Sequence, residues 1–304
     1  MERDGVSEPD FGHLVARIAE RRPRHAKFVD EARALLDAEE KADATAYLRH
    51  LLARHPLDFV AESYETLLDD TVAEQFFFMS EGRYRHSTFA EVADVVYFAP
   101  DYMQRYMIGL AVSTFLWPNH LAIRRFFRKT LPRGHAGSYL EVGPGHGLFL
   151  LQAVRELSCA RFVGVDISPA SLALTSALVR QLVPEAVPRL ALIEADFLAE
   201  TGLDGPYDLL VMGEVIEHVE RPRAFLERLR ALAAKDAHVF VTTCINTPAI
   251  DHITLFADEA EVETLIHASG FSIRERLATP YVGKTLAQCV AERLPINVAY
   301  VLSP

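Results

Sequence analysis

The chain has 304 residues, half of them hydrophobic and 24% charged, a balance that is typical of a globular protein with a sizeable core. Its length suggests two structural units and excludes a disulfide-stapled mini-protein. The formal net charge of −11 makes nucleic acid a poor partner, because proteins hold phosphates mainly with Lys and Arg.

The first part of the chain, residues 1–134, shows helical periodicity and few glycines, which predicts an all-helical domain. Apolar residues recur at three- and four-residue steps between His25 and His55 and predict one or two amphipathic helices that end at Pro56. Further helices are expected over 71–80, 87–98 and 101–130. Pro118 should bend the last of these.

The second part, residues 135–304, alternates short apolar runs with helical stretches. Such runs indicate strands of a parallel sheet that is covered on both faces, and the last two could form an antiparallel edge pair. The expected strands are Ser138–Val142, Arg161–Val165, Arg189–Ile193, Tyr207–Met212, Ala237–Thr242, Phe271–Leu277 and Ile296–Leu302.

A glycine-rich turn follows the first of these strands. The segment that begins at Glu141 reads Glu-Val-Gly-Pro-Gly-His-Gly, and glycines let a ligand approach the backbone closely where a helix begins. Gly143, Gly145 and Gly147 form the pattern G-x-G-x-G. A dinucleotide fingerprint would need Gly or Ala at position 148, which is Leu148.

Acidic residues mark the ends of four consecutive strands. Glu141 stands at the end of the first, Asp166 follows the second, Asp196-Phe197 follows the third, and Glu214 follows the fourth. An open α/β sheet builds its binding site at the carboxyl ends of its strands, so these groups should lie together. Carboxylates and aromatic ring faces suit a cationic ligand better than a pyrophosphate.

With these motifs in this order, residues from about 136 to 304 resemble the class I S-adenosylmethionine-dependent methyltransferases. The Glu-Val-Ile-Glu-His-Val segment that starts at Glu214 is similar to the corresponding turn of ubiquinone-type O-methyltransferases. The resemblance implies a Rossmann-like α/β sheet, mostly parallel with an antiparallel last strand, and S-adenosylmethionine as the cofactor.

The resemblance also implies roles at the methionine end of that cofactor. Gly143, Gly145 and Gly147 would pass under the methionine part, and Glu141 would face its amine directly or through water. Glu214 would lie where the methyl group leaves.

At the nucleoside end, the resemblance places Asp166 on the ribose hydroxyls and Ile167 against the adenine. Asp196 would accept a hydrogen bond from the adenine amine, with Phe197 beside the ring.

Aromatic residues concentrate between residues 76 and 127, within the helical part. One interpretation is an apolar lid over a hydrophobic acceptor, and the other is a helical core or a homodimer interface. The residues expected to bind the acceptor in the first case are Tyr97, Tyr102, Tyr106 and Trp117.

Candidate proton acceptors are His218, four residues after Glu214, His252 in the loop after the fifth strand, and His120 before the glycine turn. Asn246 and Asp251 in that same loop could also point toward the acceptor. No spacing supports a metal site, so metal independence is expected.

We therefore expect methyl transfer from S-adenosylmethionine to a small, hydrophobic or aromatic metabolite of natural-product or quinone-like type. The alternatives are an NAD-type Rossmann oxidoreductase and a catalytically silent methyltransferase-fold partner protein. The chain shows no signal-peptide core, no apolar run of membrane-helix length and no disulfide framework, so we expect a cytoplasmic protein without membrane or nucleic-acid partners.

Overall fold

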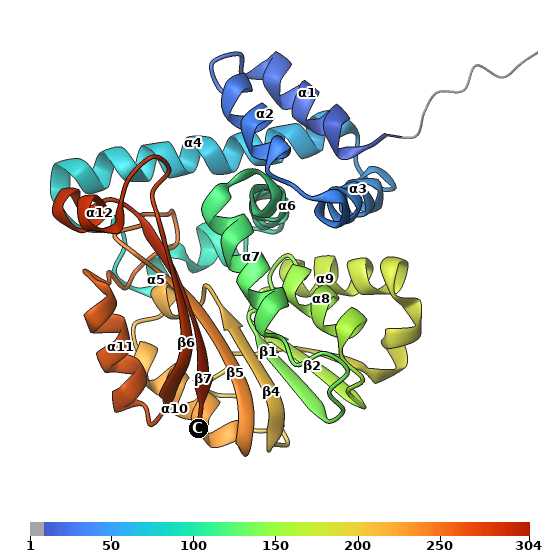
Figure 1. Cartoon of the computed structure of the whole chain (residues 1–304), viewed down its shortest axis with the longest axis vertical. Helices are drawn as coiled ribbons and strands as arrows, with labels where there is room; N and C mark the ends of the chain where they lie inside the picture. Colours follow the sequence, from blue (N-terminus) through green and yellow to red (C-terminus); the bar gives the residue numbers. More distant parts are fainter. Residues whose placement is uncertain (1–8) are drawn as a thin grey trace, which may run out of the picture.

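The structure, a computed structural model, describes residues 9–304, and its first part is helical (Figure 1). The elements are α1 (Phe11–Arg21), α2 (Ala26–Ala34), α3 (Ala38–Leu52), α4 (Leu57–Glu81), α5 (Phe89–Val92), the π-helical turn η1 (Ala93–Tyr97), α6 (Pro100–Leu116) and α7 (Pro118–Thr130). No helix of the described part is long and apolar enough to cross a membrane.

Local chemistry explains where several of these helices begin and end. Asp37 caps α3 in a capping box with Glu40, and Pro56 precedes α4. Gly82 ends α4 in the left-handed conformation, with φ of 71°. Pro118 divides the expected helix 101–130 into α6 and α7, which is a stronger break than the bend that we predicted.

The second part forms a seven-stranded sheet within residues 138–303, in the order β3-β2-β1-β4-β5-β7-β6. Strand β7 runs antiparallel to both of its neighbours, β5 and β6. The other pairs, β1–β2, β1–β4, β2–β3 and β4–β5, are parallel. The strands are β1 (Ser138–Val142), β2 (Arg161–Asp166), β3 (Leu190–Glu194), β4 (Tyr207–Gly213), β5 (Ala233–Ile245), β6 (Ser272–Pro280) and β7 (Ile296–Ser303). The predicted fold class, including the antiparallel last strand, is confirmed.

Helices cover both faces of this sheet, as expected for buried parallel strands. They are α8 (Leu148–Glu156), α9 (Pro169–Leu182), α10 (Pro222–Leu232), α11 (Glu259–Ala268) and α12 (Leu286–Glu292), with the 3-10 turns η2 (Pro184–Arg189) and η3 (Ile216–His218). One hydrophobic core lies on each face.

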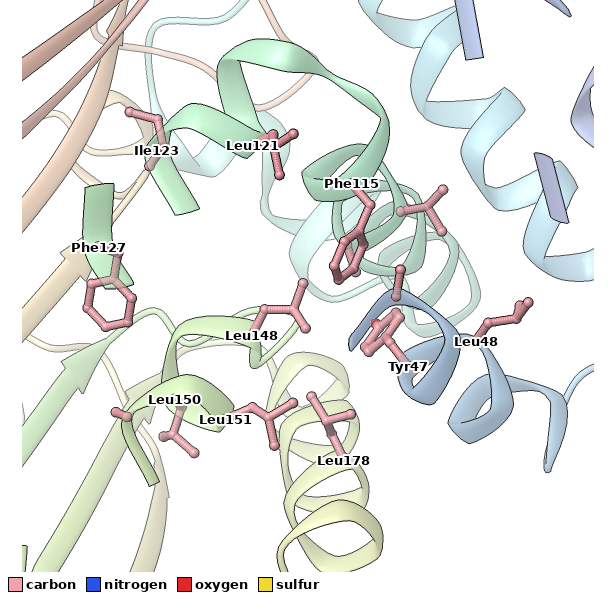
Figure 2. Close-up of a cluster of buried hydrophobic side chains, with 14 of the residues drawn as sticks. Tyr47, Leu48, Phe115, Leu121, Ile123, Phe127, Leu148, Leu150, Leu151 and Leu178 are labelled. Atoms are coloured by element: carbon pink, nitrogen blue, oxygen red, sulfur yellow. The ribbon is translucent and has the colours of Figure 1, made fainter. Parts of the chain in front are cut away.

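The core on the α8–α9 face also contains residues of the N-terminal helices. Figure 2 shows Tyr47 of α3 and Phe115 of α6 beside Leu148 of α8 and Leu178 of α9. Helix α7 packs on the sheet itself, where the rings of Phe127 and the β5 residue Phe240 lie 4.9 Å apart. The expected division into domains 1–134 and 135–304 stays a prediction, since the two parts share this core.

The helical part lies over one end of the sheet (Figure 1). A third, smaller core joins α4 to α6 there, and it includes Val92, Val96, Met103 and Tyr106. Because the glycine turn leaves β1 at this same end, the helices stand above the carboxyl ends of the parallel strands. This arrangement places the candidate site between the helices and the sheet.

Candidate functional site

A cavity of about 240 Å³ lies between the strand ends and the segment from α5 to α6. Its lining comes from both parts of the chain and is mainly apolar, as is typical of small-molecule sites. The residues that we predicted for cofactor binding and that line it are Gly143, Gly145, Asp166, Ile167, Asp196, Phe197 and Glu214.

The glycine turn forms one wall of the cavity. Gly143 and Gly145 have φ of 68° and 51°, conformations that side-chain-bearing residues rarely adopt. A Cβ atom at Gly143 would lie 2.8 Å from Cγ2 of Val215, and one at Gly145 would lie 3.2 Å from Sδ of Met107. Both positions therefore need glycine for backbone shape and for space.

Asp166 ties the second strand to this turn. Its carboxylate accepts hydrogen bonds from the backbone N–H of Gly145, at 3.2 Å, and from that of Ser168, at 2.9 Å. Burial raises the pKa of Asp166 to about 6, and the two backbone donors offset part of that effect. A ligand with hydroxyl groups would meet this carboxylate on the cavity wall.

Two predicted cofactor residues, Glu141 and Gly147, do not line the cavity. The Glu141 carboxylate is buried and accepts a hydrogen bond of 2.5 Å from the hydroxyl of Tyr139, and burial raises the pKa of Glu141 to about 8. Gly147 begins α8 with φ of 80°, and its Cβ would lie 2.9 Å from Oγ1 of Thr175. Both residues flank the glycine turn and help to hold its shape from outside the cavity lining.

The third and fourth strand ends complete the sheet side. Asp196 accepts a hydrogen bond of 2.9 Å from the backbone of Leu198, while the rings of Phe197 and Phe225 lie 5.6 Å apart. Glu214 has a left-handed backbone with φ of 51°, and its N–H donates to Oγ1 of Thr242 at 3.0 Å. Burial raises the pKa of Glu214.

The helical part supplies the opposite wall. Two of the predicted acceptor residues, Tyr97 and Tyr106, line the cavity, whereas Tyr102 and Trp117 do not. The hydroxyl of Tyr102 donates to Asp70 at 2.6 Å, and Nε1 of Trp117 donates to the hydroxyl of Tyr64 at 3.0 Å. The lining residues from this part that the sequence analysis did not single out are Phe89, Met103, Met107 and Leu110.

A polar cluster stands in this otherwise apolar wall. Asp251 accepts hydrogen bonds from the hydroxyls of Tyr106, at 3.0 Å, and Tyr97, at 3.2 Å, and its Oδ2 lies 3.3 Å from Nδ1 of His218. His218 and Asp251 both line the cavity. The loop after β5, the turn after β4 and the helical part thus bring together residues that lie far apart in the sequence.

The other candidate histidines are buried away from the cavity surface. His252 lies behind His218, its Nδ1 is 2.6 Å from the carbonyl oxygen of Thr247, and burial lowers its pKa to about 4. Nδ1 of His120 lies 2.9 Å from Oγ of Ser113, and burial likewise lowers its pKa to about 4.

Asn246 is also absent from the cavity lining. Its side-chain amide donates to the carbonyl oxygen of Ala257 at 3.1 Å, and its backbone is left-handed with φ of 49°. It shapes the loop after β5 and does not reach the cavity.

Comparison with known proteins agrees with this geometry. Residues 140–239 match the family described as "Methyltransferase domain". No curated protein sequence matches the chain.

Solved structures are similar to this chain at low sequence identity. A putative methyltransferase in complex with the Trm112 methyltransferase activator of Haloferax volcanii is 14% identical, with a TM-score of 0.52 over 68% of this chain and 96% of that one. The cyclopropane synthase MmaA2 from Mycobacterium tuberculosis is 13% identical, with a TM-score of 0.49 over 62% and 85%. The [4+2]-cyclase SpnF is 13% identical, with a TM-score of 0.48 over 60% and 79%.

The strand order, with β7 antiparallel between β5 and β6, and a cavity at the carboxyl ends of the strands define a Rossmann-like methyltransferase fold. Within this fold, residues 140–239 carry a methyltransferase domain, which agrees with the expected resemblance to the class I S-adenosylmethionine-dependent methyltransferases. This family implies S-adenosylmethionine as the cofactor.

Proposed function

We propose that this protein transfers the methyl group of S-adenosylmethionine to a small, hydrophobic or aromatic metabolite. The observation that carries the proposal is one cavity with two unlike walls. Strand-end carboxylates and the glycine turn form the first, and aromatic and Met side chains of the helical part form the second.

The first wall fits the cofactor. Without side chains at Gly143 and Gly145 the backbone stays open to the methionine part, and Glu214 lies at the end where we place the sulfonium. Asp166 would hold the ribose hydroxyls. When bound, the cofactor supplies an electrophilic methyl group.

The adenine would lie between the ends of β2 and β3. Ile167 and Phe197 offer apolar surface there, and Asp196 offers an acceptor for the adenine amine. Glu141 and Gly147 would act indirectly, by holding the glycine turn in shape.

The second wall fits an apolar acceptor. Phe89, Tyr97, Met103 and Tyr106 present rings and a thioether to the cavity, and they exclude water from the point of transfer. Tyr102 and Trp117 would support this wall from outside the cavity, and Asn246 would act indirectly by shaping the loop after β5. Holding the acceptor in line with the sulfur–methyl bond supplies much of the acceleration in such a reaction.

Among the three candidate histidines, His218 is the one that lines the cavity, so we place it next to the acceptor. His252 lies behind it, and His120 is held by Ser113 outside the cavity. The predicted catalytic roles of His252 and His120 would therefore be indirect.

The NAD-type alternative lacks support, because β7 is inserted antiparallel between β5 and β6 and Leu148 stands at the third fingerprint position. We keep the expectation of a cytoplasmic protein. A homodimer through the helical part is also part of the proposal, since Phe76 and Met79 of α4 are 68% and 72% exposed.

The proposal is tested by calorimetric titration with S-adenosylmethionine, followed by incubation with a panel of hydroxylated and amino-bearing aromatic compounds. We expect cofactor binding, and formation of S-adenosylhomocysteine that depends on one class of acceptor. Phe89→Ala should change the preferred acceptor while cofactor affinity is kept, because Phe89 belongs to the second wall.

Failure to bind the cofactor would refute the proposal. Binding without turnover of any acceptor would favour the catalytically silent partner protein instead.

A further inference from the structure

A cluster of metal-ligating side chains lies where the two walls of the cavity meet. His218, Asp251 and His252 can each offer one ligand atom such that these atoms lie within 4.8 Å of one another. The His218 and His252 rings are nearly perpendicular, at 83°, with centroids 4.6 Å apart. We propose that a divalent transition-metal ion binds to these three side chains.

Hydrogen bonds orient both imidazoles of the cluster. Nδ1 of His218 lies 3.1 Å from the carbonyl oxygen of Asp251, so Nδ1 donates there and Nε2 is the atom left to bind an ion. A carbonyl oxygen can only accept a hydrogen bond, so Nδ1 of His252, 2.6 Å from the Thr247 carbonyl oxygen, carries the proton. Nε2 of His252 is then left with a free lone pair. Backbone carbonyls commonly orient ligating histidines in this way.

Asp251 is held in a comparable manner. The hydroxyls of Tyr106 and Tyr97 donate to Oδ1 and Oδ2 of Asp251 at 3.0 and 3.2 Å. These donors fix the orientation of the carboxylate, as hydrogen bonds to a ligating carboxylate do. Neither hydroxyl comes from the sheet part of the chain, so the helical wall positions this ligand.

Charge in the cluster also calls for a cation. Asp251 is 2% exposed. Among the ion pairs of residues 9–304, no Lys or Arg is paired with its carboxylate, and its partner is His218. Buried carboxylates are costly without a counter-charge, and a divalent ion would provide one.

A second group of potential ligands adjoins the first. Glu217, Cys244 and His252 also offer atoms within 4.8 Å of one another, and they share His252 with the proposed site. We assign the ion to the first group because two of its members, His218 and Asp251, line the cavity, whereas no member of the second group does.

The donor set selects the class of ion. Two imidazoles and one carboxylate suit Zn²⁺, Co²⁺ or Mn²⁺, whereas Mg²⁺ and Ca²⁺ prefer oxygen ligands. Three protein ligands leave coordination positions open, and His218 and Asp251 border the cavity. An oxygen atom of the acceptor would complete the coordination. This last point rests on the proposed function, whereas ion binding itself does not.

The test is titration with Co²⁺ of the full chain, prepared without a histidine tag and stripped with a chelator. We expect one equivalent of Co²⁺ to bind and its visible absorption to indicate nitrogen and oxygen ligands. His218→Ala and Asp251→Asn should each weaken binding at least about tenfold. His135→Ala, which removes an exposed histidine, is the matched control and should bind as the unchanged protein does.

Tyr106→Phe provides a milder variant, since it removes one hydrogen bond to Asp251 and keeps the ring. It should weaken Co²⁺ binding by about tenfold. S-adenosylmethionine affinity is measured for every variant and reports whether the fold is intact.

No Co²⁺ binding at high micromolar concentration by protein that still binds S-adenosylmethionine would overturn the metal site and leave the proposed function standing. Equal binding by the His218→Ala variant would also overturn it. If the unchanged protein does not bind S-adenosylmethionine but does bind Co²⁺, the proposed function is refuted and the metal site is kept.

Discussion

Substitution of Asp166 tests directly whether the first wall of the cavity binds the cofactor. It combines a buried carboxylate with two backbone hydrogen bonds, from Gly145 and Ser168. Asp166→Asn keeps the size of the side chain and removes the charge. We expect this change to lower cofactor affinity and, at the same time, to alter how the stability of the free protein depends on pH.

The magnitude follows from the pKa. Burial raises the pKa of Asp166 from 3.8 to about 6, and about two pKa units correspond to about 3 kcal/mol of unfavourable free energy for the ionised group. The folded state binds the proton more tightly than the unfolded state. The stability of the unchanged protein relative to Asp166→Asn should therefore rise as the pH falls through about 6.

Between pH 7.5 and pH 5, about 1.4 kcal/mol of that penalty should disappear. The hydrogen bond that Asn cannot accept contributes equally at both values and cancels from this difference. Loss of a charged acceptor should weaken S-adenosylmethionine binding by about 10- to 100-fold at pH 7.5.

Urea unfolding at the two pH values measures the stability difference, and calorimetry measures cofactor affinity. Glu194→Gln removes an exposed carboxylate at the end of β3, outside the lining of the cofactor cavity, and serves as the control. The reasoning is refuted if the difference in free energy of unfolding between Asp166→Asn and the unchanged protein is the same at pH 5 and pH 7.5. Unchanged affinity for S-adenosylmethionine would refute the ribose role.

Two further substitutions test the turn and the core. Gly145→Ala places a Cβ atom 3.2 Å from Sδ of Met107, on a backbone with φ of 51°. We expect calorimetry to show a fall of about tenfold in cofactor affinity. The free energy of unfolding should fall by about 1–2 kcal/mol, because Ala rarely adopts this backbone conformation. Phe127→Ala empties a fully buried site against Phe240 and should lower the free energy of urea unfolding by about 3–5 kcal/mol. Tyr281→Ala, at an exposed position outside the helical part, should change it by less than about 0.5 kcal/mol, and equal losses for the two would contradict the assignment of the core.

The strands of this protein were predictable because they are continuous apolar runs. Observed β1 coincides with the expected Ser138–Val142, and the start of β5 differs most, at Ala233 instead of Ala237. The helices were less well predicted: α1 was missed, and the expected helix 71–80 is the end of the longer α4. Helical periodicity reports a buried face, but it does not fix where a helix begins or breaks.

The candidate site was only partly predictable. Residues at strand ends, such as Asp166 and Glu214, follow from chain order because parallel strands end at one edge of the sheet. Tyr97 and Tyr102 could not be told apart in the sequence, yet one faces the cavity and the other turns to Asp70. The rotation of each helix decides that difference, and packing against the rest of the chain sets it.

The sequence by itself determined the class of sheet, the glycine turn and the carboxylates at the strand ends, since these depend on residues close together in the chain. Tertiary structure alone decided that the helical part shares a core with the sheet and forms the second wall of the cavity. It also brought His218 beside Asp251 and His252, more than 30 residues onward, although their spacing in the sequence gave no sign of a metal site. Side chains so far apart in the chain meet only when β5 pairs with β4, and the chemistry of the site depends on that pairing.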